Sequence, residues 1–263
     1  MVDTTGVRIA AVGDVHAGAD DESAARLRAG FTSLADHADV LVLAGDLTRC
    51  GHPDEAAVVA GAVARAGVPT AAVLGNHDLH ADRAPEVVAV LEGAGVRVLD
   101  GASTVVDVGA LRVGIAGVNG FGGGFAGACV SVFGEPETKA FARHAVAVAD
   151  RLGGALDEIG DADVRVALLH YSPVRETLEG EPLEIYPFLG SYLLAEAIDA
   201  RGADLVVHGH AHRGSERGMT PGGVRVRNVA QPVIRAAYRV FTLQRASEPA
   251  GVGASPDRRE DTT

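Results

Sequence analysis

The chain has 263 residues, of which 47% are hydrophobic and 22% charged, and its formal net charge is -12. This length and composition are ordinary for a globular protein with a substantial core, and no linker divides the chain, so residues 1–245 are expected to form a single domain. The acidic balance argues against a general nucleic-acid binder, which needs a basic stripe.

The termini and cysteines indicate where such a protein works. No signal peptide is visible at the N-terminus, and no apolar run approaches the roughly 20 residues that span a bilayer. Two cysteines are too few for a disulfide framework and fit free thiols in a reducing compartment. A cytoplasmic protein without membrane contact is therefore expected. Residues 246–263 are rich in Ser, Pro, Gly and charge, which is typical of a disordered tail.

Short apolar runs alternate with helical patterns in the first hundred residues. The expected strands are Val7–Val12, Val40–Ala44, Thr70–Leu74 and Val96–Leu99, and the expected helices are Asp21–His37, Pro53–Ala66 and Pro85–Gly95. This alternation indicates parallel strands joined by crossover helices.

The rhythm changes after residue 103. Thr104–Val108 and Leu111–Gly117 flank Gly109-Ala110 and predict a hairpin, and Glu137–Ile159 predicts a helix with a possible break at Gly153-Gly154. The remaining expected elements are strand Val164–Leu169, helix Ser191–Arg201, strand Leu205–Val207, and two closing antiparallel strands, Val224–Val229 and Ala236–Leu243. The fold class is α/β.

Metal-type side chains follow five of the expected strands directly. They are Asp14, Asp46, Asn76, His170 and His210. In open α/β sheets, ligands bind at the carboxyl ends of the strands. Each residue alone would more often belong to a turn, but five separate segments are expected to deliver these side chains to one rim.

The ordered set of motifs resembles the calcineurin-like metallophosphoesterase superfamily. Its signature blocks stand as Asp14-Val15-His16, Gly45-Asp46, Gly75-Asn76-His77-Asp78, His170 and Gly209-His210-Ala211-His212. The resemblance implies a two-sheet β-sandwich flanked by helices, with loop insertions over a metal site. Two such segments, 119–137 and 171–192, could cap the site, and their aromatic residues could pack on a flat leaving group or on one another.

The resemblance also implies a binuclear metal centre. One metal would be held by Asp14, His16, Asp46 and His212, and the other by Asp46, Asn76, His170 and His210. Asp46 would bridge the two ions, and a metal-bound hydroxide would attack the phosphorus. Mixed imidazole and carboxylate ligands suit Mn, Fe, Zn or Ni, as divalent or mixed-valence ions, better than Mg or Ca alone.

Three further residues are candidates for contact with the substrate. His77 is not a ligand in this pattern and is the candidate general acid beside Asn76. Asp78 could orient His77 or cap the following turn. Arg213, next to His212, could touch a phosphate oxygen.

The expected substrate is a phosphodiester or phosphomonoester of a small molecule. Arg49 stands where protein phosphatases of the superfamily carry a second Asp and where purple acid phosphatases carry a Tyr. This residue therefore argues against both classes. The segment with Gly51, Pro53 and Glu55 looks more like class III cyclic nucleotide phosphodiesterases, which favours a cyclic nucleotide or nucleotide derivative. The alternatives are a nuclease-type phosphodiesterase and a non-enzymatic scaffold of the same fold.

Overall fold

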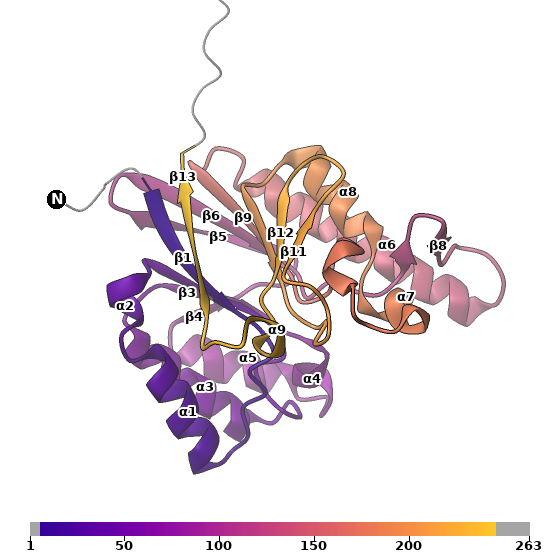
Figure 1. Ribbon diagram of the computed structural model, residues 1–263. Helices are drawn as coiled ribbons and strands as arrows, with labels where there is room; N and C mark the ends of the chain where they lie inside the picture. Colours follow the sequence, from indigo (N-terminus) through magenta and orange to yellow (C-terminus); the bar gives the residue numbers. More distant parts are fainter. Residues whose placement is uncertain (1–5, 246–263) are drawn as a thin grey trace, which may run out of the picture.

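A computed structural model describes residues 6–245, which form two mixed β-sheets lying face to face (Figure 1). In the first sheet, β1 (Gly6–Val12), β2 (Val40–Ala44), β3 (Thr70–Val73) and β4 (Val96–Val98) are parallel neighbours. Strand β13 (Arg239–Gln244) pairs antiparallel with β1 and closes that edge.

The second sheet has the order β11-β12-β10-β9-β6-β5. Strands β6 (Leu111–Gly117), β9 (Val164–Leu168), β10 (Leu205–His208) and β12 (Arg225–Asn228) run parallel. Antiparallel strands lie at both edges, β5 (Ala102–Val108) beside β6 and β11 (Arg217–Met219) beside β12.

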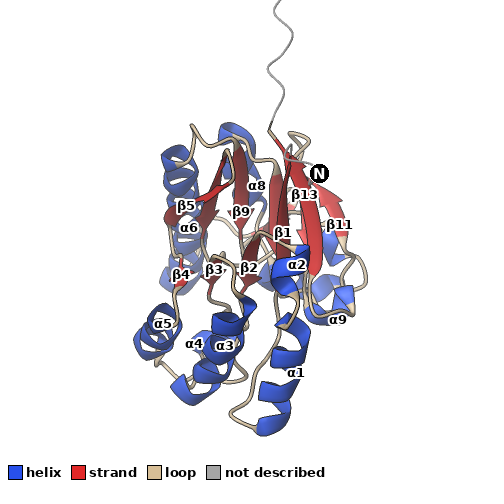
Figure 2. Ribbon diagram, turned by 90° about the vertical axis from the view of Figure 1, so that its left-hand side faces the viewer, coloured by secondary structure: helices blue, strands red, loops and turns tan. Residues whose placement is uncertain are grey.

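Helices cover the outer face of each sheet (Figures 1 and 2). Helices α1 (Asp21–Phe31), α2 (Leu34–His37), α3 (Pro53–Ala66), α4 (Asn76–Leu79) and α5 (Ala84–Gly93) accompany the first sheet, and α6 (Pro136–Glu158) and α8 (Tyr192–Arg201) the second. Alternate residues of a strand serve the two cores, because side chains point to opposite faces: Val166 and Leu168 join the core between the sheets, whereas Ala167 packs under α6 and α8.

The expected α/β sandwich is confirmed, with local differences. The helix expected at Asp21–His37 divides into α1 and α2, because the Thr32 hydroxyl donates to the Arg28 carbonyl and the chain turns at Ser33. Helix α6 runs unbroken through Gly153, where a Cβ would lie 2.6 Å from Cζ of Arg201. The guanidinium of Arg201, from the last residue of α8, lies over this glycine, and the helix continues past it.

The last strands also differ from expectation. Strand β12 is parallel to β10, and its antiparallel partner is β11, a short strand that the sequence did not predict. The Asn76-His77-Asp78 block, which follows β3, begins a single helical turn, Asn76–Leu79.

The two segments expected to form a cap pack against each other. Strands β7 (Gly124–Phe125) and β8 (Ala128–Cys129) belong to the first, and the one-turn helices η1 (Glu176–Leu178), η2 (Leu183–Ile185) and α7 (Tyr186–Leu189) to the second. The Gly124 amide donates to the Gly190 carbonyl and the Gly123 amide to that of Pro187. One short helix, α9 (Gln231–Ile234), precedes β13. Within residues 6–245, none of the helices has the length and apolar character needed to cross a bilayer. The expected C-terminal tail lies outside the described residues.

Candidate metal centre

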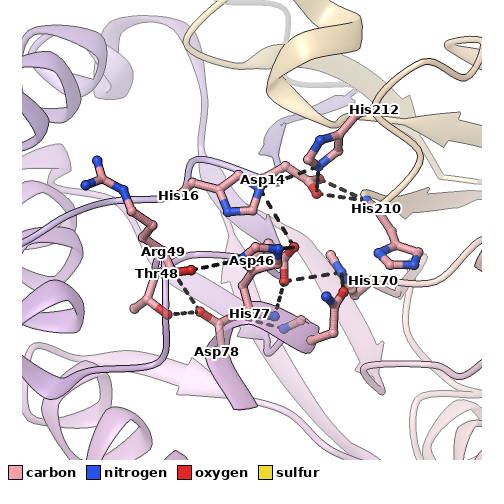
Figure 3. A network of polar contacts seen from close by, with 12 residues as sticks. Asp14, His16, Asp46, Thr48, Arg49, His77, Asp78, His170, His210 and His212 are labelled. Atoms are coloured by element: carbon pink, nitrogen blue, oxygen red, sulfur yellow. Dashed lines mark hydrogen bonds and ion pairs between the residues drawn. The ribbon is translucent and has the colours of Figure 1, made fainter. Parts of the chain in front are cut away.

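The site lies where strands of both sheets end (Figure 3). β1, β2 and β3 of the first sheet end just before Asp14, Asp46 and Asn76, and β9 and β10 of the second end just before His170 and His210. The expectation that five segments meet at one rim is met by this geometry, because all five side chains lie together there.

Glycines let these loops approach one another. A Cβ on Gly75 would lie 2.1 Å from Oδ1 of Asp46, and a Cβ on Gly209 would lie 2.1 Å from Oδ2 of Asp14. Any larger residue would push the neighbouring carboxylate away. The glycines of the Gly-Asn and Gly-His pairs are therefore needed for close approach.

Asp14, His16, Asp46 and His212 form the first group of possible ligands, and their ligand atoms all lie within 4.8 Å of one another. Nε2 of His212 is 2.8 Å from Oδ1 of Asp14, and Nε2 of His16 is 3.8 Å from Oδ2 of Asp46. The Asp14 carboxyl also accepts the backbone amide of His210 at 3.0 Å. These are the four residues expected to hold one ion.

The second group consists of Asp46, His170 and His210, again within 4.8 Å. Nε2 of His170 lies 3.4 Å from Oδ1 of Asp46 and 3.1 Å from Oδ1 of Asn76, so Asn76 adds an amide oxygen to this group. Asp46 is common to both groups, the position in which the family resemblance implies a bridging carboxylate.

Backbone carbonyls fix which nitrogen of each ring faces the site. Because a carbonyl only accepts, Nδ1 of His170 donates to Ala44 at 2.9 Å and leaves Nε2 as the free acceptor. In the same way, Nε2 of His210 lies 3.3 Å from the Phe188 carbonyl and leaves Nδ1 free. Both rings therefore present a lone pair, as ligation requires.

The electrostatics of the residues fit a cation. Burial and the nearby charge of Asp46 raise the pKa of Asp14 to about 6, although a hydrogen bond from His212 acts against this. Burial lowers the pKa of His170 and of His210 to about 3, so both rings are neutral at pH 7. Two buried carboxylates beside neutral imidazoles form an oxygen and nitrogen set that a transition-metal dication would stabilise.

His77 faces the site without belonging to either group. Its Nδ1 donates to the Arg49 carbonyl at 2.8 Å, which turns Nε2 toward Oδ2 of Asp46 at 4.0 Å. Its backbone amide donates to Oδ1 of Asp46 at 2.9 Å. His77 is half-buried, so its ring can meet a substrate.

Asp78 is fully buried below the site. Its carboxyl accepts the amides of Leu47, Thr48 and Gly75 and the hydroxyl of Thr48, at 2.6 to 3.1 Å. Asp78 therefore links the loop of Asp46 to the loop of Asn76. The Gly75 contact caps the helical turn that begins at Asn76, which is one of the two roles that the sequence left open, and Asp78 acts as a positioning residue.

The outer residues of the site are polar. Arg213 is exposed, and its backbone amide donates to Glu181. An open cavity of about 680 Å³ adjoins Asp14 and His16, and its walls include Arg26, Arg49 and Gln231. Arg26 is held by the Val15 carbonyl and by Gln231, whereas Arg49 reaches Asp20 only at 3.6 Å.

Several contributors could not be found from sequence. The carbonyls of Ala44, Arg49 and Phe188 orient the histidines, and a backbone atom leaves no residue-type signal. His208 is buried and bonds Thr177 through Nε2, so it ties β10 to the second cap segment.

The chain belongs to the calcineurin-like phosphoesterase family, whose model matches residues 7–214. The family that the motifs resembled is thereby confirmed. No curated protein matches the chain significantly.

Solved structures share the fold at low identity. Phosphopantetheinyl hydrolase from Mycobacterium tuberculosis is 16% identical, with a TM-score of 0.65, over 90% of this chain and 96% of that one. The protein TT1561 of Thermus thermophilus is 21% identical, with a TM-score of 0.58, over 91% and 99%. GAP50, the anchor in the inner membrane complex of Plasmodium, is 13% identical, with a TM-score of 0.53, over 87% and 73%.

Proposed function

We propose that this protein hydrolyses a phosphate ester of a small molecule with the help of two metal ions. The observation that carries the proposal is the position of Asp46, which belongs to both groups of possible ligands. The ions would be divalent or of mixed valence, with Mn, Fe, Zn or Ni as the candidates that suit such ligands. Two adjacent cations supply an activated water and offset charge on the attacking and leaving oxygens.

The side chains around the site would divide the remaining work. Asn76 and His77 lie where a phosphoryl group would meet the ligand cluster. With Nδ1 donating to the Arg49 carbonyl, His77 in its imidazolium form would carry a second proton on Nε2, which it would give to the leaving oxygen. Arg213 is the candidate for an outer contact with phosphate. Asp78 would hold the loops of Asp46 and Asn76 at their working distance.

The proposed partner is a small-molecule ester and not nucleic acid or a membrane. The net charge of -12 supports this choice over a nuclease, because a nuclease must attract a polyanion over a wide surface. Residues 45–55 favour a phosphodiester, with a cyclic nucleotide or nucleotide derivative as the leading class, and a reducing cytoplasm remains the proposed location.

The second candidate is a binding scaffold of the same fold. A structural neighbour described as an anchor supports it. The complete set of possible ligands and the orientation of Nε2 of His77 toward the site favour the enzyme, because a scaffold has no need of an acid–base group beside two ligand groups.

The direct test is hydrolysis of bis(p-nitrophenyl) phosphate by protein loaded with Mn²⁺. We expect turnover that is lost with chelator and restored by added metal. Asp46→Asn removes the shared carboxylate, so it should lower both the metal content and the rate, the rate by about a hundredfold or more.

The matched control is Asp36→Asn, which makes the same chemical change on an exposed helix and should behave as wild type. Wild-type protein that binds no metal in equilibrium dialysis, and hydrolyses no ester in a panel with several metals, would favour the scaffold.

A further inference from the structure

Aromatic rings extend outward from the His210 end of the site. The Tyr171 ring lies 4.3 Å from the His210 ring, between centroids. Phe121 follows at 6.2 Å from Tyr171, Phe141 at 4.8 Å from Phe121, and Phe188 at 6.4 Å from Phe141. We call Phe121, Phe141, Tyr171 and Phe188 the aromatic ledge.

The members of the ledge differ in how they are covered. Phe121, Phe141 and Tyr171 are half-buried and pack on one another. For Phe121 and Tyr171, which belong to the two cap segments, this is the packing alternative that the sequence left open. Phe188 remains 61% exposed, and its carbonyl oxygen is only 3.3 Å from Nε2 of His210. An exposed phenylalanine is thus anchored through its own backbone to a proposed ligand.

The backbone of Phe188 adjoins the proposed site at His210, and its exposed ring belongs to the row of rings that starts at Tyr171. Phe188 would lose less surface to water if an apolar group covered it, and rings prefer to pack on rings. Residues 6–245 leave the Phe188 ring 61% exposed, while its carbonyl contact with His210 holds helix α7 in place. An apolar part of a bound ester could supply it.

The opposite end of the site has a different character. The cavity beside Asp14 and His16 is walled by Arg49 and other polar residues, and Figure 3 shows Arg49 on the side away from His170 and His210. A phosphate group held between the two ligand groups would therefore have a polar space on one side and the ledge on the other.

We propose that the aromatic ledge binds an apolar or aromatic substituent of the phosphate ester, with Phe188 as the residue that sets this preference. The inference rests on the proposed function for its ligand, since the phosphoryl group is taken to lie at the ligand cluster. It adds the class of substrate: an ester that carries a planar, uncharged group on the His210 side.

Binding tests the ledge without any chemical step. Titration calorimetry of the Mn²⁺-loaded protein would compare phenylphosphonate with methylphosphonate, which share the anionic group. We expect the phenyl compound to bind more tightly, by about tenfold, which corresponds to one aromatic contact with burial. Phe188→Ser should remove most of this preference, and Phe188→Tyr should keep it.

The matched control is Phe133→Ser. Phe133 is 82% exposed and lies in the first cap segment, and it makes no ring contact with the ledge among the described residues. We expect the preference for phenylphosphonate to be unchanged in this variant, so a loss there would show a general effect of surface apolarity and would contradict the specific role of Phe188.

Hydrolysis rates distinguish a failure of the aromatic ledge from a failure of the proposed phosphoesterase activity. The measured quantity is the ratio of kcat/KM for phenyl phosphate to that for methyl phosphate, compared between Phe188→Ser and wild type so that intrinsic leaving-group reactivity cancels. A fall of about tenfold in the ratio supports the ledge. An unchanged ratio with metal-dependent turnover intact would overturn the ledge and leave the phosphoesterase standing. If the protein hydrolysed neither ester but still bound phenylphosphonate more tightly through Phe188, the proposed phosphoesterase activity would be overturned and the ledge retained.

Discussion

Four side chains of the site start from residues with a left-handed backbone. Their φ angles are 57° at Asp14, 43° at His16, 50° at Asp46 and 70° at His210. Such conformations cost about 1 kcal/mol or more for residues other than glycine, and they persist where surrounding contacts hold them. Here the amide of Asp14 donates to the Gly45 carbonyl and that of His16 to the Asp46 carbonyl. The left-handed conformations thus direct the possible ligands inward, and backbone hydrogen bonds between the loops offset their conformational cost.

A single histidine tests the division between binding metal and moving a proton. His77→Ala should lower kcat by about a hundredfold or more, the usual contribution of a general acid, because the variant lacks the imidazolium that would give its Nε2 proton to the leaving oxygen. Metal content should stay at the wild-type value, since His77 belongs to neither ligand group. The measurements are steady-state kinetics and elemental analysis on the same preparation.

His80→Ala is the control for this change, as His80 is exposed at the end of the same helical turn. If metal were lost together with activity in the His77 variant, His77 would be acting as a ligand, and its assignment as a general acid would be wrong.

At the scale of elements, the position of the possible ligands depends on hydrogen bonds between the loops that follow the strands. Asp78 accepts from both ligand-bearing loops, and Thr48 supplies two of its donors. Asp78→Asn would turn an amide N–H toward a donor that now meets an oxygen. We expect this to reduce the free energy of unfolding by about 2 kcal/mol and metal affinity by about tenfold to a hundredfold.

Urea denaturation and metal titration measure the two effects. Thr48→Val provides a graded comparison, because it removes one hydroxyl donor and leaves the three amide donors in place. A variant of Asp78 with normal stability and normal metal affinity, but with little activity, would indicate that the carboxyl takes part in the reaction itself.

The strand ends are the part of this protein that can be predicted from sequence. Short apolar runs that stop at Gly-Asp or Gly-Asn give both the strand and the position of the polar residue after it, and β2 and α3 have the predicted bounds. The ligand clusters follow, because parallel strands bring their carboxyl ends to one edge.

Other features depend on contacts distant in sequence. Strand β11 has three residues, too few for an alternating pattern, and it exists because β12 offers it a partner. Helix α7 is one turn long, and only the folded chain shows that the carbonyl of Phe188 meets His210. The Gly153-Gly154 pair suggested a break in α6, but the helix is continuous there. The sequence alone does not show that Gly153 faces the Arg201 side chain of α8.

At the scale of the whole molecule, the local charge can oppose the net charge. The protein carries -12 overall, yet two divalent cations would exceed the charge of Asp14 and Asp46 and leave the site positive. Screening limits the influence of the remote acidic surface to about 10 Å in ordinary buffer, so a small anion would respond mainly to the site.

Buried titratable groups also connect the site with the stability of the fold. Burial lowers the pKa of His170 and His210 to about 3 and that of His208 to about 4, from 6.5. Below pH 6.5 the unfolded chain therefore takes up three protons that the folded protein does not bind until about pH 4 or lower. Burial raises the pKa of Asp14 and Asp78 to about 6 from 3.8, so these two carboxyls act in the opposite sense between pH 6 and 4.

The three histidines outweigh the two carboxyls, and acid should destabilise the protein once chelator has removed metal. Between pH 6 and 4 the balance of these five groups is near one proton, and the lowered pKa of His16 and the raised pKa of His212 act in opposite senses. The free energy of unfolding should therefore fall by about 1.4 kcal/mol per pH unit, as measured by urea denaturation. His208→Gln removes one of the three histidines without touching a proposed ligand, and it should make stability nearly independent of pH over that range. Stability that increases on acidification would mean that the carboxyls dominate, and that the buried rings carry protons in the folded state.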